Sequence, residues 1–248
     1  MRLMLSAAAL SLLALAGSVA AQIPVPDYAT LREPDDREEA AVTPLKERLA
    51  ADPGDKAAAR DLLMVYQRFG DFEAGLPLAA KLAAERPDDR EVLEARIVLA
   101  TRRIDEASLF SKQSAAADLL SLCEGARARD PRSIPALNCI ARYHLLAPSI
   151  VGGDKNKADA AIAAMRALDE GQYRLLRANQ ALANEDKAEG RTRLVEAVAV
   201  LTDASDLAVA GVSLGLLGDN DTAFAALDKA LSLDPTDPLT LYQRGRAV

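Results

Sequence analysis

A glycine-rich segment is the first place where the residue types could support chemistry. Residues 147–161, APSIVGGDKNKADAA, place a Gly-Gly-Asp-Lys core before an alanine-rich run. Glycine-rich loops bind phosphate when their backbone N–H groups converge at a helix N-terminus after a β-strand. Leu137, Ile140 and His144 precede this loop at helical spacing, so no strand leads into it. We therefore predict an enlarged turn between two helices rather than a nucleotide site.

The two cysteines lie where a covalent bond between helices is possible. Cys123 and Cys139 are each eight residues from Pro131, which marks a predicted turn between two helices. In an antiparallel helix hairpin, equal distances from the turn put side chains at the same level. An exported protein also meets an oxidising environment. We predict a disulfide between them, and the alternative is two buried thiols that serve as small apolar side chains.

His144 is the only histidine, so any histidine chemistry would have to use it. No cysteine or carboxylate accompanies it at metal-binding spacing, and nothing nearby resembles a nucleophile elbow. We expect His144 to have a packing or surface role. The sequence predicts no catalytic residue, no metal site and no cofactor.

The N-terminal residues predict export. Residues 1–21, MRLMLSAAALSLLALAGSVAA, combine a basic start, a short apolar run and small residues, as a cleaved signal peptide does. The apolar run is shorter than the ~20 residues of a membrane-spanning helix, so an uncleaved anchor is the lesser alternative. We predict cleavage before Gln22 and no membrane insertion afterwards. Residues 22–42 are rich in proline and acidic residues, and predict a flexible acidic leader.

The charge balance excludes two classes of partner. The chain has 30 Lys and Arg against 37 Asp and Glu, a net charge of -7, and no basic run. It therefore lacks the electrostatic footprint of a nucleic-acid-binding or anionic-membrane-binding protein. Half of the residues are apolar, only 4% are aromatic, and alanine dominates, which favours closely packed helices over sheets.

Internal repeats indicate how these helices are organised. Similar segments end at four prolines, in RLAADPGD, KLAAERPDD, ARARDPRS and ALSLDPTD, at Pro53, Pro87, Pro131 and Pro235. Pro53 and Pro87 are 34 residues apart, the period of a helix-turn-helix repeat array. Each helix pair in such an array has an apolar face that only its neighbours can bury.

The strongest unit, residues 204–237, resembles the tetratricopeptide repeat family. Gly211 permits close helix approach, Gly218-Asp219 forms the turn, and the other signature positions are Leu207, Ala210, Leu214, Ala223, Leu227, Ala230 and Pro235. A second unit, residues 56–89, matches more loosely because Leu63 replaces the usual small residue. Its matching positions are Leu62, Tyr66, Gly70, Gly75, Ala79, Leu82 and Pro87. The resemblance implies an all-α, right-handed α-solenoid over residues 43–248.

The remaining units depart from this spacing. Pro87 and Pro131 are 44 residues apart, and the surplus predicts an extension around RRIDEASLFSKQ between two helices. Residues 173–203 contain two helices whose register the sequence leaves open. We expect about five helix pairs with an additional helix at each end. The first helix is predicted to start at Thr43-Pro44, with Thr43 as the N-cap and Pro44 in the first turn.

The resemblance implies a concave groove, lined by first helices, that commonly holds a peptide. Six of the nine groove-facing positions carried over are arginines, whose forked guanidinium groups bind carboxylates. This predicts an extended or C-terminal acidic peptide as ligand. The alternative is a solvated charged face balanced by Glu91 and Glu94. The nine residues are Arg60, Gln67, Arg68, Arg102, Asn138, Arg142, Arg174, Arg177 and Asn184. The last unit instead presents apolar Ala208, Val212 and Gly215.

These features together predict a non-enzymatic protein–protein interaction scaffold in a bacterial periplasm. A periplasmic small-molecule carrier, working with a transporter, is the alternative from another class. A third hypothesis is self-association through the C-terminal helix, where Leu241 and Val248 would be exposed at an uncapped end. The loop at residues 147–151 resembles, over a short stretch, a variant of exported tetratricopeptide proteins. It is either a contact site or a lengthened turn without a role.

Overall fold

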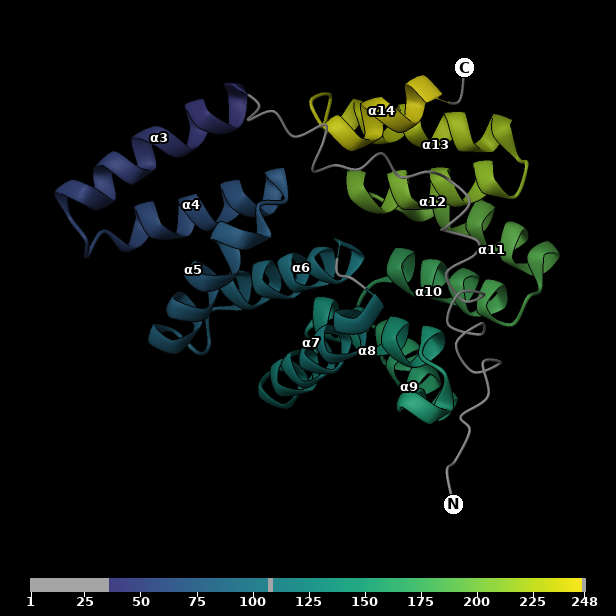
Figure 1. Ribbon diagram of the computed structural model, residues 1–248. Coiled ribbons are helices and arrows are strands. Elements are labelled where there is room, and N and C mark those ends of the chain that lie inside the picture. The colour runs from purple at the N-terminus through teal and green to yellow at the C-terminus, as the bar shows by residue number, and fades with distance from the viewer. Residues whose placement is uncertain (1–35, 107–108, 247–248) are drawn as a thin grey trace. The chain divides into compact units, whose positions relative to one another are not determined.

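The computed structural model describes residues 36–106 and 109–246. Every regular element in these residues is a helix: there are twelve α-helices and one short 3₁₀ helix, η1. Successive α-helices pack as pairs, with α3 before and α14 after five pairs (Figure 1). The predicted all-α repeat fold is confirmed.

The chain divides into two compact units between Cys139 and Ile140, here called the N-terminal and C-terminal units. The N-terminal unit contains α3 (Asp36–Ala51), α4 (Lys56–Phe69), α5 (Phe72–Glu85), α6 (Arg90–Glu106) and α7 (Leu109–Arg129). Helix α8 (Ile134–Leu146) crosses the boundary. The C-terminal unit continues with η1 (Ser149–Val151), α9 (Lys155–Met165), α10 (Glu170–Ala183), α11 (Lys187–Val200), α12 (Ala204–Leu216), α13 (Asn220–Leu233) and α14 (Pro238–Arg246).

Aspartate N-caps start many of these helices. The Asp55 side chain accepts a hydrogen bond from the Ala58 N–H at 2.9 Å, and Asp219 accepts one from Thr222 at 3.3 Å. Each bond satisfies a backbone donor that has no partner within its own helix. The same arrangement starts five further helices, at Asp71, Asp154, Asp169, Asp186 and Asp203. The aspartates that follow the repeated turns thus fix where these helices begin.

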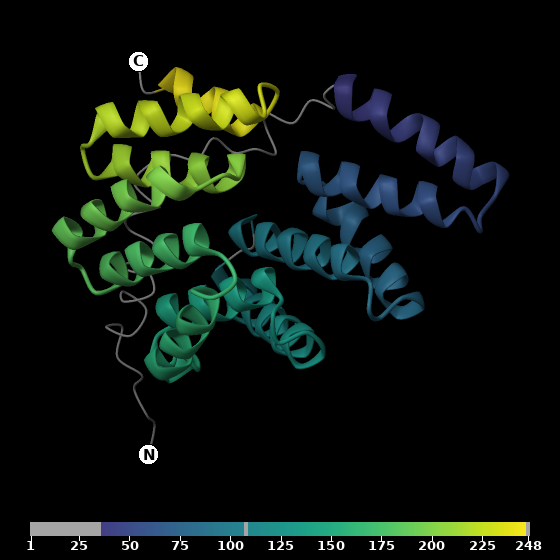
Figure 2. The ribbon, with the colours of Figure 1, turned by 180° about the vertical axis from the view of Figure 1, so that it is seen from behind.

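The core of the C-terminal unit contains the predicted signature positions of the last repeat. Helices α10 to α14 are stacked in chain order (Figure 2). A Cβ atom added at Gly211 would lie 3.0 Å from Cγ of Leu227 and 3.1 Å from the Ala223 carbonyl oxygen. Only glycine allows α12 and α13 to approach this closely without a shift. The other buried members are Leu207, Ala210, Leu214, Ala223, Leu227 and Ala230, packed with Leu175, Leu194 and Ala197.

The core of the N-terminal unit accommodates the residue that departs from the repeat pattern. Leu63 is fully buried and belongs to a cluster with Leu82 of α5 and Leu99 of α6. A larger side chain is therefore accepted at a position that is usually small. Gly70 ends α4 in the left-handed conformation with φ of 74°, as its place in the repeat turn predicts.

The first helix begins earlier than predicted. Helix α3 starts at Asp36, so Thr43 is not its N-cap and Pro44 lies inside it, and residues 36–42 of the predicted flexible leader are helical. Acidic residues near a helix N-terminus and alanines favour this extension. Val42 is also buried against Leu62 and Tyr66 of α4. This packing offsets the backbone hydrogen bond that Pro44 removes.

The surplus residues before Pro131 lengthen two helices. Helices α6 and α7 have 17 and 21 residues, whereas α4 and α5 have 14 each. The predicted extension between helices is therefore largely helical, up to Glu106 and again from Leu109. The pair whose register the sequence left open is regular, because α10 and α11 have 14 residues each.

Among residues 36–106 and 109–246, no helix combines the length and the apolar character that crossing a membrane requires. The predicted signal peptide, residues 1–21, and the leader up to residue 35 lie outside the described residues.

Candidate functional site

The nine predicted groove residues lie on the first helices of successive pairs. Arg60, Gln67 and Arg68 are on α4, Arg102 is on α6, Asn138 and Arg142 are on α8, and Arg174 and Arg177 are on α10, which Asn184 ends. The unit boundary separates Asn138 from Arg142. The two groups are therefore described separately.

In the N-terminal unit, the predicted basic residues are partly engaged within the protein. Arg60 of α4 forms an ion pair with Glu91 of α6. Glu94 instead pairs with Arg90 on its own helix, with 2.9 Å between Nε and Oε1. Arg102 is exposed and its side chain passes close to Gly70, where an added Cβ would lie 3.5 Å from Cδ of Arg102. Gln67 and Asn138 are half-buried, and Arg68 is exposed.

In the C-terminal unit, both arginines of α10 hydrogen-bond within the protein. Arg174 donates from Nε to Oε1 of Glu170 at 2.7 Å. Arg177 donates from a terminal nitrogen to Oε1 of Gln180 at 2.6 Å, and Gln180 in turn donates to Asp159. A carboxylate therefore compensates the charge of Arg174, whereas Arg177 binds a neutral amide oxygen.

Two further predicted residues of this unit differ in how they are held. Asn184 accepts a hydrogen bond from Nζ of Lys155 at 3.1 Å. Arg142 is exposed and makes no hydrogen bond or ion pair with another described residue. Its guanidinium group is therefore the predicted C-terminal-unit cation that remains available to a carboxylate.

A polar contact between α10 and α12 was missed by the sequence analysis. Gln172 donates from Nε2 to Oδ2 of Asp206 at 2.5 Å. Burial raises the pKa of Asp206 to about 7, and the neighbouring carboxylates of Asp203 and Asp169 add to the rise. The hydrogen bond from Gln172 and the positive charge of Arg142 oppose the rise in this pKa.

The sequence contained only a weak signal for this contact. Asp206 follows the N-cap Asp203 by three residues, a position where a helix N-terminus ordinarily favours a negative charge. Burial by the packing of α10 against α12, together with the nearby carboxylates of Asp203 and Asp169, makes that charge unfavourable. The surface around Arg142 therefore carries carboxyl groups as well as a guanidinium group.

The predicted helix–helix turn before α9 is confirmed. Helix α8, not a strand, precedes residues 147–154, and η1 follows it. A Cβ added at Gly153 would lie 1.7 Å from the Ala147 carbonyl oxygen, so the chain can fold back only with glycine there. Asp154 then caps α9 by accepting from the backbone of Asn156 at 2.9 Å. The glycines serve chain reversal, and the strand-turn-helix context of a phosphate loop is missing from this segment.

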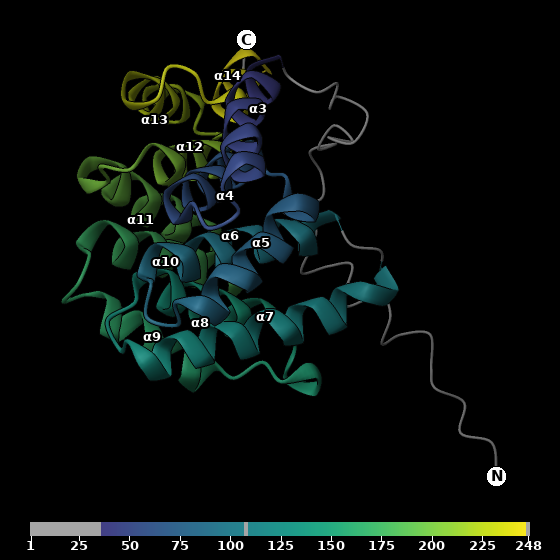
Figure 3. The same cartoon turned by 90° about the vertical axis from the view of Figure 1, so that its left-hand side faces the viewer.

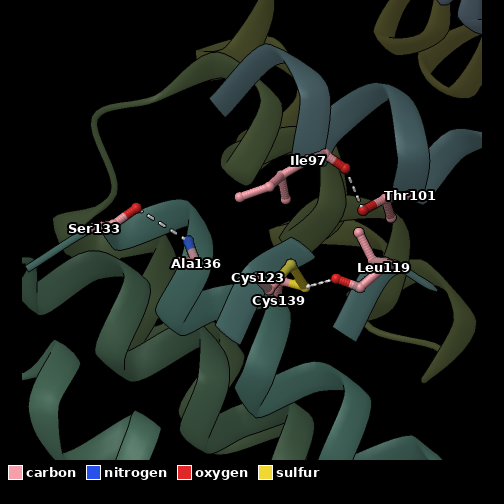
Figure 4. The surroundings of a disulfide bond; sticks show 7 residues. All are labelled: Ile97, Thr101, Leu119, Cys123, Ser133, Ala136 and Cys139. Atoms are coloured by element: carbon pink, nitrogen blue, oxygen red, sulfur yellow. Dashed lines mark hydrogen bonds between the residues drawn. A yellow bond between two sulfur atoms is a disulfide. The ribbon is translucent and has the colours of Figure 1, made fainter. Parts of the chain in front are cut away.

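Cys123 of α7 and Cys139 of α8 are joined by a disulfide bond, with an S–S distance of 2.04 Å and Cα atoms 6.3 Å apart (Figure 4). The bond closes a segment of 16 residues around the turn between the helices. Ser133 caps α8 within this segment by accepting from the Ala136 N–H at 3.4 Å. The disulfide lies within the N-terminal unit.

His144 occupies a core position, with 2% of its side chain exposed. The ring of Tyr143 meets it edge to face, with 5.2 Å between ring centroids. The residues that the structure describes contain no group of three or more histidine, cysteine or acidic side chains placed to hold a metal ion. Leu241 of α14 is 46% exposed, and Val248 lies outside the described residues.

Sequential helix pairs with small residues at their contacts define a helical repeat protein. No protein-family model and no curated protein sequence matches the chain. Among solved structures, a tetratricopeptide repeat protein from Parabacteroides merdae is similar, with a TM-score of 0.59 and 13% identity. The match covers 97% of this chain and 93% of that one. A thermophilic TPR protein from Thermus thermophilus is 16% identical over 96% of this chain and 97% of its own, with a TM-score of 0.48. The first likeness shows that the fold is of tetratricopeptide repeat type.

Proposed function

We propose that this protein is a non-enzymatic interaction scaffold of the periplasm that binds an extended or C-terminal acidic peptide. The peptide lies on the first helices of the C-terminal unit, and a carboxylate of the peptide pairs with Arg142. The repeat fold supports a protein partner, because stacked helix pairs offer an extended surface rather than an enclosed reaction site.

The exposed guanidinium group of Arg142 carries this proposal. Arg60 and Arg174 already pair with carboxylates of the protein, and Arg177 donates to Gln180, so these guanidinium groups are less available to a ligand. Arg142 has no such acceptor among the described residues and lies on α8, which belongs to the predicted face. An exposed arginine fork without a hydrogen-bonded acceptor of its own can bind a carboxylate through two parallel hydrogen bonds.

Crosslinking capture in a periplasmic extract, followed by mass spectrometry, tests the proposal. The purified protein is compared with Arg142→Glu and with Lys187→Glu, which makes the same charge change at an exposed position of the second helix α11. We expect one partner to be captured by wild type and Lys187→Glu and lost with Arg142→Glu. Capture that is unchanged by Arg142→Glu would contradict the role of this face.

Export requires a separate measurement, because it depends on residues 1–21. We expect the protein recovered from the periplasmic fraction to have the intact mass of a chain that begins at Gln22. A full-length mass in the cytosolic fraction alone would exclude the periplasmic location.

A further inference from the structure

The N-terminal unit has a surface hollow whose lining contains none of the residues predicted to bind a peptide. A cavity of about 780 Å³ lies between α5, α6 and α7, and we call it the α5–α7 trough. Figure 3 shows the α5 ribbon above the α7 ribbon in this unit. Each helix contributes residues spaced by about one turn, such as Leu76 and Ala80 on α5 and Ala115 and Leu119 on α7. The walls of the trough are therefore the sides of these helices.

The lining contains both large apolar side chains and small residues. Leu76 and Leu122 are half-buried and Leu119 is buried, so the apolar surface is only partly covered by the protein itself. Ala80 on α5 and Ala100 on α6 leave room for another backbone to come close. Three helices that present apolar stripes and alanines to a common trough match the shape of a fourth helix.

Charged side chains of both signs also line the trough. Arg96 and Arg103 of α6 line the trough, as do Glu73 of α5 and Asp118 of α7. None of the four makes a hydrogen bond or ion pair with another described residue. A surface that combines apolar and charged side chains is typical of a protein interface.

The two arginines set the charge pattern of the occupant. Arg96 and Arg103 are seven residues apart on one helix, which places them on the same face about 10 Å apart along the axis. Acidic residues two turns apart on a docked helix would meet both of them. The acidic residues on the flanking walls disfavour a purely anionic ligand such as a fatty acid.

We propose that the α5–α7 trough binds an amphipathic helix of a partner protein, with an apolar stripe flanked by acidic residues seven positions apart. Its apolar side chains pack on Leu76, Leu119 and Leu122, and its carboxylates pair with Arg96 and Arg103. This surface is independent of Arg142, which lies in the other unit. Either proposal can therefore fail while the other stands.

Binding of a designed peptide tests the proposal. The probe is a fluorescein-labelled 18-residue amphipathic helix with a leucine stripe and two glutamates seven residues apart, and the matched peptide has lysines at those two positions. Fluorescence anisotropy measures binding to the purified protein. We expect saturable binding of the glutamate peptide, at least tenfold tighter than that of the lysine peptide. Arg96→Glu should weaken binding of the glutamate peptide at least tenfold and strengthen binding of the lysine peptide.

Two further variants separate local effects from unfolding. Ala100→Leu narrows the trough without changing its charge. It should weaken the binding of both peptides and leave the circular dichroism spectrum unchanged. Arg129→Glu reverses an exposed charge at the end of α7, outside the trough, and should leave binding unchanged. Equal affinity for the two peptides, no saturable binding of either, or binding of dodecanoate in their place would overturn the proposal.

Discussion

Asp206 gives the sharpest quantitative prediction, because the structure raises its pKa from 3.8 to about 7. A raised pKa in the folded state means that folding favours the protonated carboxyl. The contribution to stability is complete below about pH 4, where the unfolded chain is also protonated, and is lost as the pH rises toward 7. Above about pH 7, Asp206 is ionised in both states and the loss is constant.

The magnitude follows from the size of the shift. A rise of about three pKa units corresponds to about 4 kcal/mol. The carboxyl is only half-buried, so solvent screens part of this energy, and we expect about 2 kcal/mol. Asp206→Asn removes the ionisation and keeps an oxygen that can accept the hydrogen bond from Gln172. The variant should therefore be more stable than wild type by about 2 kcal/mol above pH 7, with a smaller difference at lower pH.

Urea unfolding of wild type and variant between pH 5.5 and 8.5 measures this difference. A carboxyl NMR titration, with the Asp206 signal assigned by its loss in Asp206→Asn, should give a midpoint near 7. Asp221→Asn, at an exposed position in the first turn of α13, is the control and should show no such pH-dependent gain. An Asp206 midpoint near 4, or an Asn variant whose gain does not change with pH, would refute the reasoning.

Three further predictions test other contacts. The native protein should have no titratable thiol, and two free thiols would contradict the disulfide. The double variant Cys123→Ala with Cys139→Ala should lower the free energy of unfolding by about 3 kcal/mol, because the disulfide closes a segment of 16 residues. In urea unfolding, Gly153→Ala should lower the free energy of unfolding by more than about 2 kcal/mol, because its Cβ would meet the Ala147 carbonyl. Gly125→Ala in α7 should raise the free energy of unfolding by up to about 1 kcal/mol, because no atom lies within 4 Å of its added Cβ. If the exposed side chain of Leu241 supports self-association, light scattering of wild type should show a mass that rises with concentration, and Leu241→Glu should have the monomer mass. A constant monomer mass in wild type would reject self-association through Leu241.

The sequence alone was sufficient for the helix pairs with strong local signals. Gly70 and Gly218 adopt positive φ at the predicted turns, and Gly211 lies at a close helix contact, because each position needs a residue without a Cβ. These requirements are local or involve neighbouring helices, so they leave a pattern at fixed spacing. The aspartate caps are equally local and could have located most helix starts.

Other features depended on contacts that spacing does not encode. The start of α3 at Asp36 was missed because a proline ordinarily marks a first turn, while burial of Val42 against α4 was not visible in the sequence. The nine predicted groove residues were assigned from their offsets within a repeat. Offsets place residues on a helix but do not identify their neighbours on the next helix.

The sequence determined the all-helical fold and the repeat spacing, because backbone conformation and apolar periodicity are set by residues close together in the chain. The tertiary structure decided which charged side chains are available to bind a ligand. Arg60 meets Glu91 and Arg142 meets no acceptor among the described residues, although both are arginines on first helices. Burial of Asp206 between helices likewise changes its pKa without any change in its local sequence. Charge compensation and desolvation depend on distances through space, and only the folded chain fixes those distances.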